Sequence, residues 1–469
     1  MVFSSTVFLF AFMPLLFLFY FMASDRWRNY ILLAFSLVFY AWGEPKFLPV
    51  MILLVGLDYI FAYAIGSTDS KTKRKFWLFL TIATNIGLLG YYKYTRFILE
   101  NVNAAFDTQI AIPDIVLPIG ISFFTFQAMS YVIDVYMGNA TVQKNPFYVL
   151  LYVSLFPQLV AGPIVRYKTV EKEILSRHTT LADFSAGLER FIVGFGKKII
   201  ISNNVAIIVD KIFAMPKIDA SMAWLAVISY GLQIYFDFSA YSDMAIGLGR
   251  IFGFHFEENF NFPFISKSVA EFWRRWHISL GSWFRDYLYI PLGGNKKGVA
   301  RHIFNMFIVW SLTGIWHGAM WTFVVWGLYF FVFLVLEKYV FASVLKKIPN
   351  WMQHIYLLFV LNISWALFRA DNLQQSWWVI KHMLRMHITA EGWAFTNMYL
   401  HQYGLYLVLG IIFSMPVYKI IKEKIEGCRS EKTKLVLTGI NYAGLLLLFF
   451  VSVLYLVNSS YNPFIYFRF

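Results

Sequence analysis

A run of 34 residues without Asp, Glu, Lys or Arg, from Ile303 to Leu336, limits the possible folds of this chain more than any other feature. A single straight helix of that length would measure about 50 Å, whereas the hydrocarbon core of a bilayer is about 30 Å thick. The run therefore predicts two segments that meet near His317, where Gly314 and Gly318 lower the cost of a break. Because an ionisable group at membrane depth is energetically expensive, His317 is a candidate functional residue.

The composition is typical of a membrane protein. Of the 469 residues, 59% are hydrophobic and only 14% are charged, against about 25% charged residues in soluble proteins. The net charge of +14 comes from Lys and Arg that flank apolar segments, so it indicates contact with the lipid bilayer and not with nucleic acid. The single cysteine, Cys428, excludes an internal disulfide. These features predict a polytopic, all-α integral membrane protein without a separate soluble domain.

Apolar segments recur along the whole chain, and the first is interpreted as a retained span because no basic residue precedes it. The predicted spans are residues 7–23, 30–42, 47–66, 76–92, 115–136, 189–213, 222–238, 303–317, 319–337, 352–369, 401–418 and 435–457. The Lys- and Arg-rich loops at 67–75 and 419–434, together with Arg26 and Arg28, belong on the cytoplasmic face. About 11 to 12 crossings are expected, and twelve place both termini outside the cytoplasm.

Two stretches do not fit simple crossings. Residues 147–163 are apolar but end in Ala-Gly-Pro between basic loops. We expect them to enter the membrane and return, which is possible where protein surrounds the backbone. Residues 240–302 mix aromatic side chains with Lys and Arg, a pattern typical of an interfacial or re-entrant segment. We expect this second stretch on the cytoplasmic side.

Two histidines are candidates for chemistry. His277 follows a stretch rich in Trp and Arg, and His317 lies 40 positions further on. A neutral imidazole in an apolar site is a suitable general base toward a hydroxyl. The alternative for each is a hydrogen-bonded packing residue, and spacing alone does not separate the two.

Basic residues near His277 are candidates for binding phosphate. Arg274, Arg275, Arg285 and Lys296 suit a phosphate-bearing carrier such as coenzyme A or phosphopantetheine, because cationic side chains bind phosphate oxygens. The alternative is that these side chains extend to lipid headgroups.

Four aspartates lie in or beside apolar segments: Asp58, Asp134, Asp237 and Asp243. They either form a proton relay or pair with basic residues and helix ends. The sequence has no spacing of His, Cys, Asp or Glu typical of a metal site, so no metal is expected.

The last residues, 458–469, form an aromatic tail beyond the last predicted span. One interpretation is an anchor in the aromatic belt of the membrane. The other is a segment that folds back into the protein and presents the hydroxyl of Tyr466 as a nucleophile.

Several blocks of the sequence resemble the membrane-bound O-acyltransferase superfamily. They are Met1–Ser5, Leu117–Phe123, Tyr235–Gly249, Glu258–Asn261, Glu271–Leu280, Phe284–Asn295 and Trp316–Gly318. The similarity covers nearly the whole chain and implies a single domain, 1–469, with a catalytic core at 230–327. The branch it most resembles is the membrane subunit of alginate O-acetylation, with its relatives that acetylate cellulose or peptidoglycan.

The resemblance implies residue roles and a fold. The histidine of the Trp-His-Gly motif, His317, corresponds to the catalytic residue of the superfamily, and His277 to a second active-site residue. The implied fold is a ring of helices around a central tunnel that joins a cytoplasmic donor to an extracytoplasmic acceptor. The tail is similar to the end of a small partner peptide in teichoic acid D-alanylation, which favours Tyr466 as an acyl relay.

The implied function is transfer of an acetyl group across a bacterial inner or plasma membrane. The donor is acetyl-coenzyme A or an acyl carrier protein thioester, used as a substrate and not as a permanently bound cofactor. An extracytoplasmic, serine-dependent acetyltransferase or esterase-like partner is expected to acetylate a polysaccharide. The alternatives are transfer of D-alanyl or other acyl groups to a cell-wall polymer, a membrane transporter, and a non-catalytic scaffold.

Overall fold

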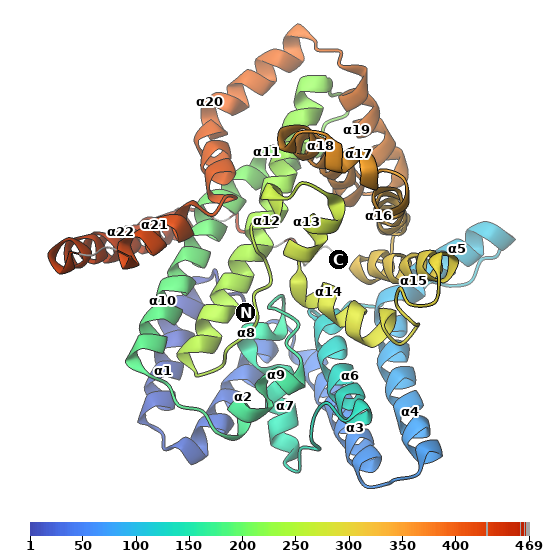
Figure 1. Ribbon diagram of the computed structural model, residues 1–469, viewed down its shortest axis with the longest axis vertical. Coiled ribbons are helices and arrows are strands. Elements are labelled where there is room, and N and C mark those ends of the chain that lie inside the picture. The colour runs from blue at the N-terminus through green and yellow to red at the C-terminus, as the bar shows by residue number, and fades with distance from the viewer. Residues whose placement is uncertain (428–429, 460, 464, 466–469) are drawn as a thin grey trace. The chain divides into compact units, whose positions relative to one another are not determined.

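The described part of the chain is built from helices, as expected for an all-α protein. The computed structural model describes residues 1–427, 430–459, 461–463 and 465, and these contain no β-strand. Contacts divide the chain into two compact units: unit 1, made of Met1–Phe191 and Met244–Glu257, and unit 2, made of Ile192–Asp243 and Glu258–Phe469. Figure 1 labels the helices and colours the chain by residue number.

Unit 1 holds the helices of the first part of the chain, together with the start of α10 (Leu181–Gly196) and the end of α12 (Ala220–Ile251). Its other elements are η1 (Phe8–Phe12), α1 (Met13–Met22), α2 (Asp25–Gly43), η2 (Pro45–Phe47), α3 (Leu48–Gly66), α4 (Lys71–Leu89), η3 (Gly90–Tyr94), α5 (Thr95–Phe106), α6 (Ile121–Met137), α7 (Pro146–Ser154), α8 (Phe156–Leu159) and α9 (Tyr167–Leu175). The helices α3, α4 and α6 lie side by side (Figure 1).

A buried polar pair joins α3 to α4. The amide nitrogen of Asn85 donates to both carboxylate oxygens of Asp58 at 2.9 Å, and both side chains are buried. In unit 2, Asp237 and Asp243 each form an ion pair with a lysine. Buried polar groups normally find such partners. For Asp58, Asp237 and Asp243 these contacts favour paired aspartates over a proton relay.

Unit 2 carries the rest of α10 and α12 and the helices of the second part of the chain. Its other elements are η4 (Lys197–Ser202), α11 (Asn203–Phe213), η5 (Pro263–Ile265), α13 (Val269–Arg275), α14 (Ile278–Phe284), η6 (Arg285–Tyr289), α15 (Val299–His317), α16 (Trp321–Tyr339), α17 (Ala342–Lys347), α18 (Asn350–Arg369), α19 (Leu373–Arg385), α20 (Ala390–Phe413), α21 (Val417–Glu426) and α22 (Glu431–Asn458).

The long uncharged run, Ile303–Leu336, is broken where the sequence predicts it. Helix α15 ends at His317, and α16 begins at Trp321 after Gly318 and Met320 in extended backbone. The two helices pack against each other. The prediction of two segments meeting at this histidine is therefore confirmed.

Glycines bring α15 and α16 into backbone contact. A β-carbon at Gly314 would lie 2.4 Å from the carbonyl oxygen of Phe323, and one at Gly327 would lie 2.4 Å from that of Trp310. Any larger residue at either position would push the two helices apart. Small residues are the ones that allow such close approach of helices in membranes. The contact fixes His317, three residues after Gly314, against α16.

Five described helical segments are long and apolar enough to cross a membrane. They are Pro45–Gly66, Leu181–Phe213, Trp321–Tyr339, Asn350–Arg369 and Glu431–Asn458. A sixth follows if α20 and α21, which are bent by 56° relative to each other, form one broken span. These helices agree with a polytopic membrane protein, and the larger number of crossings stays a prediction.

Several predicted spans have different boundaries in the structure, among them the following two. In the span predicted at 115–136, the helix begins only at Ile121. The backbone of Gly120 just before it is left-handed, with a φ of 76°, so the helix cannot extend further toward the N-terminus. The span predicted at 222–238 continues to Ile251. The first residues of the predicted interfacial segment, 240–251, therefore form the end of α12. The helix continues past its charged residues Asp237 and Asp243.

The predicted re-entrant stretch, 147–163, forms two short helices, α7 and α8. They are separated at Leu155, whose ψ of 112° is not helical. Residues 151–167 are all buried, so the irregular backbone is enclosed by protein, the condition for such backbone at membrane depth. Its entry into the membrane stays a prediction.

We predict that Gly314→Ala destabilises the protein, because the new methyl group would collide with the backbone of α16. Overpacking of this kind costs about 1–3 kcal/mol, and thermal unfolding in detergent measures it. The control is Gly404→Ala in α20, where nothing lies within 4 Å of the new β-carbon; this change should leave stability unchanged or raise it by about 0.5–1 kcal/mol. Equal melting temperatures for Gly314→Ala and wild type would contradict the close contact.

Candidate active site

His277 lies in the connection between α13 and α14, outside the candidate membrane spans. Its backbone is left-handed, with φ 45° and ψ 53°, a conformation that costs a non-glycine residue about 1–3 kcal/mol and is concentrated at functional sites. Only 2% of the residue is exposed. Burial and, to a lesser extent, nearby His317 hold the pKa of His277 well below its ordinary value, so the imidazole is neutral.

Asn259 holds His277 in one tautomer. The Oδ1 atom of Asn259 accepts hydrogen bonds from the backbone N–H and the hydroxyl of Ser279, at 3.2 and 2.9 Å, which identifies it as the carbonyl oxygen. The same oxygen lies 3.1 Å from Nδ1 of His277, so Nδ1 donates and carries the proton of the neutral ring. The Nε2 atom then presents a lone pair. His277 is therefore a proton acceptor at Nε2.

His317, the last residue of α15, is 7% exposed and is surrounded by aromatic rings. Its imidazole meets the rings of Trp326 and Phe368 edge to face, with ring centroids 5.1 and 5.3 Å apart. The ring of Trp316 lies 5.1 Å from that of His317 and 6.1 Å from that of His277. The two histidines predicted from the sequence thus meet around one tryptophan, away from bulk water.

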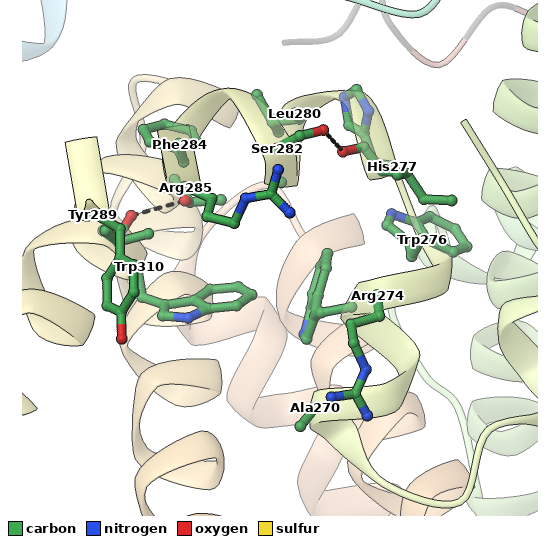
Figure 2. Close-up of a pocket in the computed structure, with 15 residues that line it drawn as sticks. Ala270, Arg274, Trp276, His277, Leu280, Ser282, Phe284, Arg285, Tyr289 and Trp310 are labelled. Atoms are coloured by element: carbon green, nitrogen blue, oxygen red, sulfur yellow. Dashed lines mark hydrogen bonds between the residues drawn. The ribbon is translucent and has the colours of Figure 1, made fainter. Parts of the chain in front are cut away.

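A cavity of about 320 Å³ opens beside His277, and we call it the His277 cavity. Its walls include Arg274 and Arg285 together with Trp273 and Trp310. Figure 2 shows the guanidinium of Arg285 reaching toward the middle of the cavity, whereas the side chain of Arg274 extends toward Ala270. The cavity has the size of a small-molecule site, and two guanidinium groups in its wall suit an anionic ligand.

Two of the predicted phosphate ligands, Arg275 and Lys296, do not line this cavity. Arg275 pairs with Glu271 at 3.0 Å and donates to the carbonyl of Asn261 at 3.2 Å. Lys296 is exposed in the turn before α15. Arg285 also pairs with a carboxylate, that of Asp286, at 2.7 and 3.2 Å. Its side chain is 60% exposed, so a ligand that arrives from solution reaches the guanidinium in competition with Asp286.

A second cavity, much smaller, adjoins His317, and we call it the His317 chamber. It measures about 20 Å³ and is lined by Ile234, Phe238, Trp276, His317, Trp326, Trp365 and Phe368. A space of this size holds about one water molecule. Trp276 lines both the chamber and the His277 cavity. The two spaces therefore meet at the indole of Trp276.

The C-terminal tail folds back into unit 2, where a buried ion pair holds it. The side chains of Lys198 and Asp237, each 2% exposed, lie 2.5 Å apart. The ammonium of Lys198 donates to the carbonyl oxygen of Pro463, and the N–H of Ile465 donates to Asp237 at 2.8 Å. Ile465 belongs to the same hydrophobic core as the tryptophans of the His317 chamber. The predicted acyl relay, Tyr466, lies outside the described residues.

Sequence reasoning assigned no role to Asn259, nor to the pairing of Asp237 with Lys198. Asn259 stands in a block already noted for its resemblance, Glu258–Asn261, but its contact with His277 joins residues 18 positions apart, and no local pattern predicts it. The contact of Lys198 with the tail joins residues 265 positions apart, and no local pattern predicts it.

Comparisons with known proteins find relatives that cover the whole chain. The sequence model of the membrane-bound O-acyltransferase family matches residues 142–373, a range that contains both histidines. The chain is 37% identical to the probable alginate O-acetylase AlgI of Pseudomonas putida over 100% of both proteins. It is 32% identical to the peptidoglycan O-acetyltransferase of Helicobacter pylori, over 100% of this chain and 98% of that protein. The teichoic acid D-alanyltransferase of Bacillus subtilis is 31% identical over 50% of this chain and 62% of its own length.

We predict that Asp237→Asn frees the C-terminal tail, because Lys198 would lose its counter-ion in a buried site. Breaking a buried pair costs about 3–5 kcal/mol, so carboxypeptidase should remove the tail of the detergent-purified protein at least about tenfold faster. The matched control is Asp243→Asn on the same helix, whose partner is Lys197 at 2.7 Å. Equal digestion rates for the two variants would show that the pair does not hold the tail.

Proposed function

The chain belongs to the membrane-bound O-acyltransferase family, in the branch of the alginate O-acetylases. We propose that it takes acetyl groups from a cytoplasmic thioester and moves them across the membrane for the O-acetylation of an extracytoplasmic polysaccharide. The observation that carries this proposal is the pair of buried histidines around Trp316, each beside its own cavity. The larger cavity suits a donor, and the smaller one suits an acetyl methyl group.

The proposed donor is acetyl-coenzyme A or the thioester of an acyl carrier protein, which is consumed as a substrate. Arg274 and Arg285 in the wall of the His277 cavity support this choice, because guanidinium groups bind phosphate oxygens in bidentate fashion. Arg275 and Lys296 lie outside the cavity wall, so we assign them a weaker, long-range attraction for the same phosphates.

The proposed reaction is acyl transfer with His317 as general base. His317 takes the proton of an attacking hydroxyl, and the hydroxyl oxygen bonds to the carbonyl carbon of the thioester. The carbonyl oxygen carries the negative charge until the carbon–sulfur bond breaks. The sulfur leaves as a thiolate and takes the proton back from the imidazolium of His317. An alcohol and a thioester thus become an ester and a thiol, and the histidine ends neutral.

The negative charge on the carbonyl oxygen needs a hydrogen-bond donor. A neutral His277 with its proton on Nδ1 is an acceptor at Nε2, which favours an indole N–H for this task. Trp326 lies against His317 and lines its chamber, and its buried Nε1 has no hydrogen-bond partner among the described residues. We therefore assign the oxyanion to Trp326 and a proton-accepting role to His277.

The proposed first acceptor is the hydroxyl of Tyr466 or that of an external partner. Support for the tyrosine comes from the residue before it, Ile465, which is buried and bonded to Asp237. The acetyl group would then pass to an extracytoplasmic, serine-dependent acetyltransferase or esterase-like protein, and from there to the polysaccharide.

The proposed location is a bacterial inner or plasma membrane, with both termini outside the cytoplasm. The Lys- and Arg-rich loops at 67–75 and 419–434 support this orientation, because positively charged loops stay on the cytoplasmic side. The donor then reaches its cavity from the cytoplasm, where thioesters of coenzyme A are made.

The second candidate function is transfer of D-alanyl groups to a cell-wall polymer. It is favoured by the similarity of half of the chain to a teichoic acid D-alanyltransferase. The His317 chamber favours acetyl instead, because about 20 Å³ leaves no room for a methyl group and an ammonium together, and no carboxylate lines it.

We predict that His317→Ala abolishes acetyl transfer, with a loss of at least about 10²–10⁴-fold, the usual contribution of a general base. Purified protein is incubated with radiolabelled acetyl-coenzyme A, quenched in acid and mapped by mass spectrometry. Label on Tyr466 in wild type should vanish in both His317→Ala and Tyr466→Phe. The control is His382→Ala on α19, a histidine that lines neither cavity.

Acetylated polysaccharide in cells that carry only His317→Ala, at normal protein level, would contradict the proposal. That outcome would favour a scaffold, and substrate flux that persists in the same variant would favour a transporter. Acetylated polysaccharide without label on Tyr466 in wild type would keep the acyltransferase and assign the first acceptor to the external partner.

We also predict that Arg285→Ala raises KM for acetyl-coenzyme A by about 10- to 100-fold, the equivalent of about 1.5–3 kcal/mol for hydrogen bonds to a charged group. The kcat should change little, since the phosphates are remote from the thioester. Arg275→Ala is the matched control, because Arg275 is paired with a carboxylate as Arg285 is, but lies outside the cavity wall. An equal rise in KM for both variants would contradict a specific phosphate contact.

A further inference from the structure

A third cavity shares one wall residue with the His317 chamber. It measures about 460 Å³, and its mostly apolar walls come from η5, α12, α18 and α20, including Ile228, Leu232, Phe264 and Leu361. We call it the apolar cavity. It has room for several methylene groups, whereas the chamber has room for about one water-sized group.

Trp365 separates the two spaces. It is the residue of α18 that lines both the His317 chamber and the apolar cavity. The residue is 2% exposed, so its indole is almost completely removed from the outer surface. Nothing else named in the wall of the chamber, apart from this indole, belongs to the wall of the apolar cavity. The partition between a small space and a large one is thus a single side chain.

The indole of Trp365 is held rigidly in this position. Its ring lies 5.3 Å from that of Trp276 on one side. On another side it rests on α12 at Gly231, where an added β-carbon would stand 3.0 Å from Cδ1 and Nε1 of Trp365. Glycine thus leaves just enough space for the ring, and close packing of this kind opposes movement of the indole.

We propose that Trp365 restricts the acyl donor to acetyl, by closing the His317 chamber against an apolar cavity that would otherwise accept a longer acyl chain. This inference rests on the proposed acetyl transfer at His317. An acetyl methyl group fills the chamber, and each further methylene would collide with the aromatic wall. Hydrophobic pockets discriminate by about 10- to 200-fold for each methylene. The specificity for acetyl is therefore a property of the wall and not of the catalytic groups.

The test is competition between acetyl-, butyryl- and hexanoyl-coenzyme A in detergent-purified protein, with product acyl groups counted by mass spectrometry. In Trp365→Ala the ratio of butyryl to acetyl product should rise at least about tenfold over wild type, while acetyl transfer continues. Trp365→Phe, which removes less volume, should give a smaller rise and serves if the alanine variant fails to fold. Trp377→Ala is the matched control, because Trp377 is exposed on α19 and lines neither space.

A second change tests where the longer chain lies. In the Trp365→Ala background, Leu361→Phe narrows the apolar cavity and should reverse the gain for hexanoyl transfer. Persistence of that gain in the double variant would overturn the assignment of the apolar cavity.

The inference is also overturned if folded Trp365→Ala and Trp365→Phe keep the acyl preference of wild type. Failure of wild type to transfer acetyl at all is a different result, because it removes the proposed function and the inference together.

Discussion

The backbone contact between α15 and α16 is the interaction on which the site depends. Apolar side chains gain little by leaving lipid for another helix, so helices in membranes associate through close packing and hydrogen bonds. Gly314 and Gly327 remove the side chains that would keep the two helices apart. As a result, the helix that ends in His317 meets the helix that carries Trp326. The same contact that stabilises the pair of helices thus defines the geometry of the candidate catalytic group.

Two sets of buried polar groups in this apolar interior form networks, and each network fixes one conformation. Asn259 fixes the tautomer of His277 through three hydrogen bonds to its carbonyl oxygen, and the pair of Lys198 and Asp237 fixes the path of the tail. Leaving one of these buried groups without its partner would cost more free energy than a single hydrogen bond contributes to stability. Such groups therefore have few alternative arrangements, which is the physical meaning of a preorganised site.

The break at His317 and the all-helical fold could be predicted from the sequence, because they follow from the length of an uncharged run and from local apolar patterns. Arg275 was grouped with Arg274 and Arg285 by composition, yet it pairs with Glu271 four residues earlier, an arrangement that helix geometry favours and that the sequence already contained. The roles of Asn259 and Trp365 could not be predicted, since both arise where segments distant in the sequence pack together. Helix ends such as Ile251 were also missed, because a helix continues through polar residues when its surroundings bury them.

The size of the His317 chamber has a consequence for the stability of the donor. Water competes with every alcohol for a thioester, and a general base activates either one. In the proposed reaction the methyl group of the donor fills a chamber of about 20 Å³, which leaves no space for a hydrolytic water. The bound substrate then excludes water from its own thioester. Such an enzyme holds a loaded donor without futile turnover until its acceptor arrives, and it needs no moving lid to do so.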